Sequence, residues 1–166
     1  YKIKIISVHG RVETTIRTGG SRDPIVNPPQ TESEATDAIN SMKNYLTQKR
    51  GAWHMVEASK AHEAYHYSEY KAFAAYYWPL VGACINKIKV PSSGNKANDE
   101  ALAANQLFQV LDVIDNISKA YGLFMNYALD VPGGRSYQVG QAILNQAIVQ
   151  VQQLAASKGW RVPQGI

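Results

Sequence analysis

The chain has 166 residues, of which 45% are apolar and 18% are charged. This length suits one folded domain, and this composition excludes an intrinsically disordered chain. Its single cysteine, Cys84, excludes a disulfide framework. The 17 lysine and arginine residues outnumber the 13 acidic residues and give a net charge of +4. Because these cations are scattered along the sequence, we expect no nucleic acid as a partner.

The sequence contains no segment long enough to span a membrane. The longest apolar run, from Ala72 to Ile85, has 14 residues and includes Pro79, whereas a bilayer span needs about 20. No signal-peptide pattern is visible, but the chain opens with Tyr1 instead of methionine. We therefore interpret it as a fragment of a longer chain, an interpretation that allows for a targeting segment that has been removed.

The first 18 residues alternate apolar and polar side chains on either side of His9 and Gly10. Alternation with a break of this kind predicts two short strands that form an N-terminal β-hairpin. Residues 19–30 follow with two glycines and three prolines. This composition predicts a loop between the β element and the rest of the chain.

The remainder of the sequence has the apolar spacing of helices. Thr31 and Glu34 form a capping-box pattern that begins the first of them. A proline and two loops divide the rest, and the helices are expected at about 31–51, 52–77, 80–89, 98–121 and 136–157. We thus predict a mainly α (α+β) fold with four to five helices. It forms a single domain over 1–166, with a β element at 1–18 and a helical part at 31–158.

One motif contains residues that could bind a metal and act in catalysis, and it lies within the expected central long helix. His62, Glu63 and His66 fit the pattern His-Glu-x-x-His. Two histidines four residues apart project from one face of a helix and can bind the same metal ion. Glu63 lies about 100° round the helix from His62 and can reach a water activated by the metal without binding the ion itself. The motif therefore predicts a zinc site for hydrolysis, with Glu63 as the general base.

The third zinc ligand is less well defined by the sequence. Glu100 begins the next long helix, 34 residues after His66, and an antiparallel helix would present it to the metal. Glu69 lies seven residues after His62, a rise of about 10 Å along a helix. It is therefore better placed to accept the free N–H of a ligand imidazole, or to serve as the alternative ligand. We favour Glu100 as the third ligand and leave open Glu69 or another residue, such as an aspartate.

Several other histidines and tyrosines lie along the helices. A tyrosine hydroxyl beside the metal would stabilise an oxyanion, and Tyr121, Tyr127 and Tyr137 are as eligible for this role as the tyrosines nearer the motif. His54 lies eight residues before His62, about two turns back on the same side. We interpret it as an exposed or hydrogen-bonded histidine in preference to a fourth ligand.

The segment from Trp53 to Tyr70, with His62-Glu63-x-x-His66 inside it, resembles the zincin metallopeptidases, and a Glu100 ligand would resemble their gluzincin branch. The segment also looks like zincin-like domains of bacterial secreted or polymorphic-toxin proteins, which end near a pair like Gly159-Trp160. The resemblance covers about residues 50–160, and it implies metal ligands at His62 and His66 and a catalytic Glu63. It also implies secretion by, or delivery from, a bacterium.

Two positions depart from the zincin pattern. Ala64 stands where a bulky apolar residue is preferred, and Lys60 stands where an uncharged one is preferred. The expected function is a Zn²⁺-dependent peptidase that acts on a peptide or protein substrate. The alternative is a non-catalytic, metal-stabilised helical module of a secreted bacterial protein, which would need no general base. A di-iron bundle would require a second Glu-x-x-His, which the sequence lacks.

Overall fold

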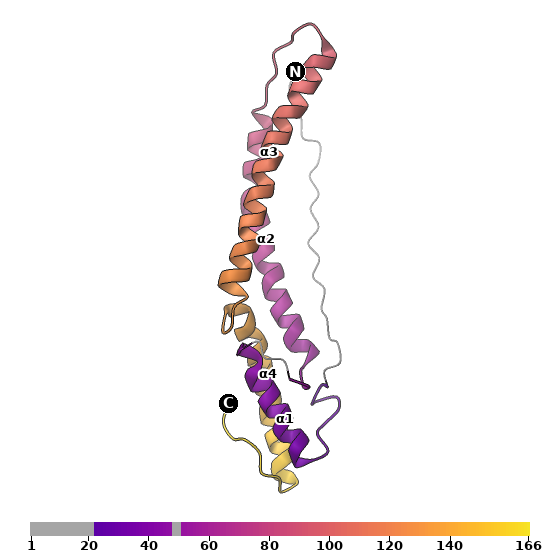
Figure 1. The fold of residues 1–166 in the computed structure, drawn as a ribbon, viewed down its shortest axis with the longest axis vertical. Coiled ribbons are helices and arrows are strands. Elements are labelled where there is room, and N and C mark those ends of the chain that lie inside the picture. The colour runs from indigo at the N-terminus through magenta and orange to yellow at the C-terminus, as the bar shows by residue number, and fades with distance from the viewer. Residues whose placement is uncertain (1–21, 48–50) are drawn as a thin grey trace. The chain divides into compact units, whose positions relative to one another are not determined.

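A computed structural model describes residues 22–47 and 51–166 of the chain. This part is helical (Figure 1). It contains four α-helices, α1 (Glu32–Lys43), α2 (Val56–Asn86), α3 (Lys96–Phe124) and α4 (Arg135–Ser157). A 3-10 helix, η1 (Asn44–Thr47), follows α1, and a π-helical turn, η2 (Met125–Leu129), follows α3. The predicted mainly α character fits this structure.

The predicted β contribution is wrong for the described residues. They contain no strand or sheet, and an isolated parallel β-bridge joins Arg22 to Trp53. Residues 1–18, to which the N-terminal β-hairpin was assigned, lie outside the described residues. The fold is therefore mainly α and not α+β. Apolar–polar alternation is weak evidence for a sheet, because two strands need a third strand or a packed helix to be stable.

The chain divides into two compact units, which are described separately. The core unit comprises, of the described residues, 22–47, 51–67 and Met125–Ile166, and the hairpin unit comprises Ser68–Phe124. The boundary at Ser68 falls inside α2, so this helix contributes its first turns to the core unit and the remainder to the hairpin unit.

In the core unit, α1 and α4 lie side by side (Figure 1). The Oγ1 atom of Thr31 accepts the N–H of Glu34 and begins α1, as the capping-box pattern predicted. The buried side chains of α1 recur at helical spacing and meet those of α4, and Trp53 and Ala58 complete the cluster. The buried residues from the two helices are Ala35, Ala38, Ile39, Met42, Leu144, Ala147, Ile148 and Val151.

In the hairpin unit, the second part of α2 and the whole of α3 run antiparallel (Figure 1). Pro79 was expected to end or kink a helix, but it lies inside α2, which continues to Asn86. A proline costs a helix interior about 3 kcal/mol. Beyond it, Ile85 belongs to a buried cluster against which Val81 of α2 and Leu107 of α3 both pack, and this packing keeps the later turns helical.

The hairpin unit buries few large side chains. Its core contains Ile85, Ile88 and Val90, whereas many of its other large apolar residues, such as Tyr76 and Phe108, are more than 40% exposed. No helix in the described ranges is both long enough and apolar enough to cross a bilayer.

Candidate metal centre

The first turns of α2 bring the two histidines of the motif together. His62 and His66 are four residues apart in a continuous helix, as predicted, so their rings lie on one face. The ring centroids are 4.7 Å apart and the two Nε2 atoms are 3.0 Å apart. His62 is buried, with 8% of its surface exposed. Two imidazole nitrogens are thereby directed at the same point.

A carboxylate reaches this point from the turn between η2 and α4. The Oδ1 atom of Asp130 lies 3.1 Å from Nε2 of His62 and 3.5 Å from Nε2 of His66. This oxygen is itself shielded from solvent, although the side chain as a whole is about one third exposed. His62, His66 and Asp130 form the one group of three potential metal ligands found in the described part of the chain.

Hydrogen bonds to backbone carbonyls fix the turn that carries Asp130. Its N–H donates to the carbonyl of Met125 at 2.8 Å and closes the π-helical turn η2, a feature that is frequent at functional sites. The hydroxyl of Ser136 donates to the carbonyl of Leu129, also at 2.8 Å. The N–H of Gly133, a residue with φ of 74°, donates to the carbonyl of Leu46 and ties the turn to η1.

The spacing of the three donor atoms fits a tetrahedral metal ion. A ligand atom lies about 2.0–2.1 Å from zinc, so two ligands at a tetrahedral angle are separated by about 3.4 Å. The observed separations of 3.0, 3.1 and 3.5 Å lie close to that value. Two imidazole nitrogens and one carboxylate oxygen are also a donor set that zinc accepts. The three residues could therefore hold a metal ion, and zinc itself stays a prediction.

The surroundings of His62 favour its neutral form. Burial lowers the pKa of His62, and the neighbouring His66 lowers it further. The charges of Asp130 and Glu63 oppose this shift, but the net direction is downward. Only a neutral imidazole offers the lone pair that a metal requires, so this environment favours the metal-binding form of His62.

The other residues that the sequence suggested are placed as follows. Glu63 lies between the two histidines on α2, half-buried, and is not one of the three grouped donors. Glu69 lies in the part of α2 that belongs to the hairpin unit. Glu100 is exposed on α3 in the same unit, and its carboxylate lies 3.6 Å from Nζ of Lys96.

The grouped carboxylate is thus Asp130, which sequence reasoning covered only as an unspecified aspartate. A signal for it exists in the sequence. Asp130 directly precedes Val-Pro-Gly-Gly, a turn between two long helices, and a carboxylate at a helix end can face a neighbouring helix.

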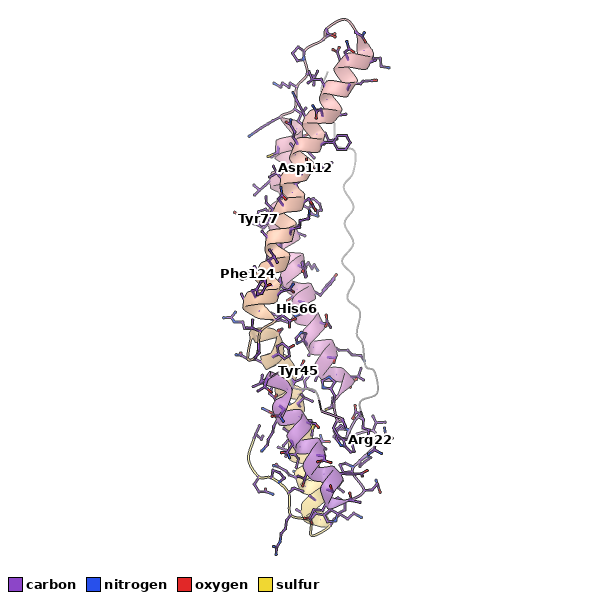
Figure 2. All side chains as sticks on the ribbon, in the orientation of Figure 1. Arg22, Tyr45, His66, Tyr77, Asp112 and Phe124 are labelled. Carbon is purple, nitrogen blue, oxygen red and sulfur yellow. The ribbon has the colours of Figure 1, made fainter. Side chains whose placement is uncertain are left out.

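Aromatic side chains surround the buried histidine. The hydroxyl of Tyr45, from η1, lies 3.2 Å from Nδ1 of His62, and Figure 2 labels Tyr45 and His66 on their separate segments. The ring of Tyr137 meets the ring of His62 edge to face at 4.7 Å. His54 stacks on Tyr45 and its Nε2 atom lies 2.6 Å from Oγ of Ser59, so it is a hydrogen-bonded histidine, as expected.

The three candidate tyrosines for oxyanion stabilisation are in different surroundings. Tyr137 lies against His62, as described above. Tyr127 is 77% exposed on η2. Tyr121 belongs to the hairpin unit, where its ring stacks on Phe73.

Comparisons with known proteins assign no family to this chain. No protein-family model matches it, and neither the curated proteins nor the solved structures contain a match. The likeness to the zincin metallopeptidases therefore depends on His62, Glu63 and His66 themselves and stays a prediction.

Proposed function

We propose that this chain is a zinc-dependent hydrolase of peptide bonds. Its ligands are His62, His66 and Asp130, and Glu63 is the general base. One observation carries the proposal: Nε2 of both histidines and Oδ1 of Asp130 lie within 3.5 Å of one another. In the proposed site, Asp130 has the role that the sequence analysis gave to Glu100.

The number of protein ligands favours catalysis over a purely structural site. Structural zinc sites have four protein ligands, whereas catalytic sites have three and keep a position for water or substrate. The group here contains three. When bound, a divalent ion supplies a Lewis acid that polarises a substrate carbonyl and makes a neighbouring water more acidic.

Glu63 supplies the base in this proposal. It is adjacent to His62 on α2, and its charge acts on that imidazole. Its carboxylate takes a proton from the attacking water and passes it to the nitrogen of the leaving amine. The water oxygen bonds to the carbonyl carbon first, and the C–N bond of the amide then breaks as the amine nitrogen receives the proton. The products are a carboxylic acid and an amine, so the substrate is a peptide or protein.

The test measures zinc content and hydrolysis in the same set of proteins. The variants are Glu63→Gln, the double variant His62→Ala/His66→Ala, and Glu57→Gln as a matched control on an exposed position of α2. We expect one zinc per chain in the wild type, Glu63→Gln and Glu57→Gln, and none in the double variant. The rate at which Glu63→Gln cleaves a peptide library should be about 10²–10⁴-fold lower than that of the wild type. The other zinc-bound variant, Glu57→Gln, should cleave at the wild-type rate.

Two results would contradict the proposal. Stoichiometric zinc in the double variant would remove the assigned site. If the wild type holds zinc but cleaves no more peptides than Glu63→Gln does, the non-catalytic, metal-stabilised module is favoured instead.

A further inference from the structure

The second nitrogen of His62 has a defined neighbour. An imidazole that binds a metal through Nε2 carries its proton on Nδ1, and a partner for that N–H fixes the ring orientation. The hydroxyl oxygen of Tyr45 lies 3.2 Å from Nδ1 of His62. Nε2 of the same ring faces Asp130 and His66. The two nitrogens of His62 therefore meet different groups, the metal ligands on one edge and Tyr45 on the other.

Tyr45 is itself held in place by rings on more than one side. His54 stacks on it with centroids 5.4 Å apart and an interplanar angle of 23°. The ring of Tyr137 lies 5.2 Å away at a tilt of 54°. These contacts restrict the rotation of the Tyr45 ring, so its hydroxyl is directed at His62 before any metal binds.

A buried glycine of α4 makes room for this tyrosine. A Cβ atom at Gly140 would lie 2.7 Å from both Oη and Cε1 of Tyr45, closer than real Cβ atoms approach other atoms. Glycine inside a helix costs about 1 kcal/mol relative to alanine. The presence of glycine at this internal position of α4 is explained by the close approach of the Tyr45 hydroxyl.

We propose that Tyr45 is a positioning residue for His62 and that Gly140 permits it. The hydroxyl of Tyr45 accepts the Nδ1–H of His62 and holds Nε2 toward Asp130 and His66. A phenol both donates and accepts hydrogen bonds, so Tyr45 can bond Nδ1 in either neutral tautomer. This inference rests on the proposed zinc site.

The test measures zinc affinity by competition with a chelating dye. Tyr45→Phe removes only the hydroxyl, and Tyr76→Phe makes the same change at a position that is 67% exposed. Gly140→Ala displaces the Tyr45 ring. Gly122→Ala, in α3, is its control, because a Cβ there meets nothing within 4 Å. Loss of a group that orients a ligand costs about 10–100-fold in metal affinity. We expect that loss in Tyr45→Phe and Gly140→Ala and no change in either control.

Two further readouts separate positioning from a general loss of stability. The double variant Tyr45→Phe/Gly140→Ala should bind zinc no more weakly than the worse single variant, because both substitutions remove the same hydrogen bond. In ¹⁵N NMR of the zinc-bound protein, the Nδ1 resonance of His62 should shift in Tyr45→Phe while that of His66 stays in place. Circular dichroism checks the helical fold of each variant. If Gly140→Ala does not fold, the isosteric Tyr45→Phe carries the test.

The outcomes distinguish this inference from the function on which it rests. Wild-type zinc affinity in Tyr45→Phe, with an unchanged Nδ1 resonance, overturns the role of Tyr45 and leaves the zinc site intact. A wild type that binds no zinc overturns both. Zinc binding that weakens in Tyr45→Phe, in a protein that hydrolyses nothing, supports the positioning role and removes only the catalytic proposal.

Discussion

Gly134 packs directly against the backbone of Leu129: a Cβ atom at position 134 would overlap the carbonyl oxygen of Leu129 and lie 2.9 Å from that of Val131. Gly134 is the N-cap of α4, and its φ of −64° is accessible to any residue. Glycine is therefore required at this position because a Cβ atom has no space there, and not because of the backbone conformation. The close approach folds the chain back on itself around Asp130, the residue that brings a carboxylate to His62 and His66.

Gly134→Ala should therefore disturb the metal centre. An alanine there must push the Leu129 carbonyl away, and Asp130 is the next residue along the chain. We expect zinc affinity to fall by about 10-fold or more and the free energy of unfolding to fall by about 1–3 kcal/mol. Dye competition and urea unfolding measure the two effects, with Gly122→Ala as the control in open space. Wild-type zinc affinity in a folded Gly134→Ala would show that the turn does not set the position of Asp130.

The identity of the third ligand can be tested with three matched substitutions. Asp130→Asn keeps the shape of the side chain but removes the charged oxygen that lies 3.1 Å from His62 Nε2. We expect it to weaken zinc binding by more than the 10–100-fold typical of a group that only orients a ligand. Glu100→Gln and Glu69→Gln should leave the affinity nearly unchanged. Isothermal titration with zinc measures all three, and a larger loss in Glu100→Gln would restore the gluzincin-like arrangement.

Two of the three candidate ligands could be predicted from the sequence because their arrangement is local. His62 and His66 are one helical turn apart, so a correct helix prediction is enough to place both rings on one face. Asp130 is 64 residues beyond His66, and its approach depends on a π-helical turn and on the bond from Gly133 to Leu46. No periodicity in the sequence encodes such a contact. Glu100 was favoured because it begins a helix, but in the structure it pairs with Lys96 in the hairpin unit.

The same distinction explains the fold. The capping box at Thr31 and the apolar spacing of α1 and α4 are local signals, and the structure follows them. Pro79 is a local signal that the structure does not follow. The turns beyond it are stabilised by the cluster that Val81 and Ile85 form with residues of α3, which offsets the free-energy cost of a proline inside a helix. Tertiary contacts of this kind cannot be counted from the sequence of one helix.

Acid should destabilise the metal-free protein through His62. Burial lowers the pKa of this imidazole in the folded state, whereas in the unfolded chain it takes the ordinary value of about 6.5. The unfolded state therefore binds more protons as the pH falls below about 6.5, and the stability that neutral His62 contributes at higher pH is lost on the way down to the folded pKa. Urea unfolding in chelator at pH 7.5 and pH 5 should show a smaller difference in His62→Asn than in the wild type. An equal difference would assign the acid sensitivity to other groups.

Zinc should stabilise the core unit, because its ligands come from two segments that unfolding separates. His62 and His66 lie at the start of α2, and Asp130 lies in the turn before α4. The unfolded chain does not hold these donors together, so zinc at 100 times its dissociation constant should add about 2.7 kcal/mol to the free energy of unfolding. Differential scanning calorimetry should show this as a rise in Tm in the wild type and in Glu63→Gln, since the base is not a ligand. Magnesium prefers oxygen donors and should give little shift. An equal zinc-induced rise in His62→Ala/His66→Ala would mean that the stabilising ion binds elsewhere.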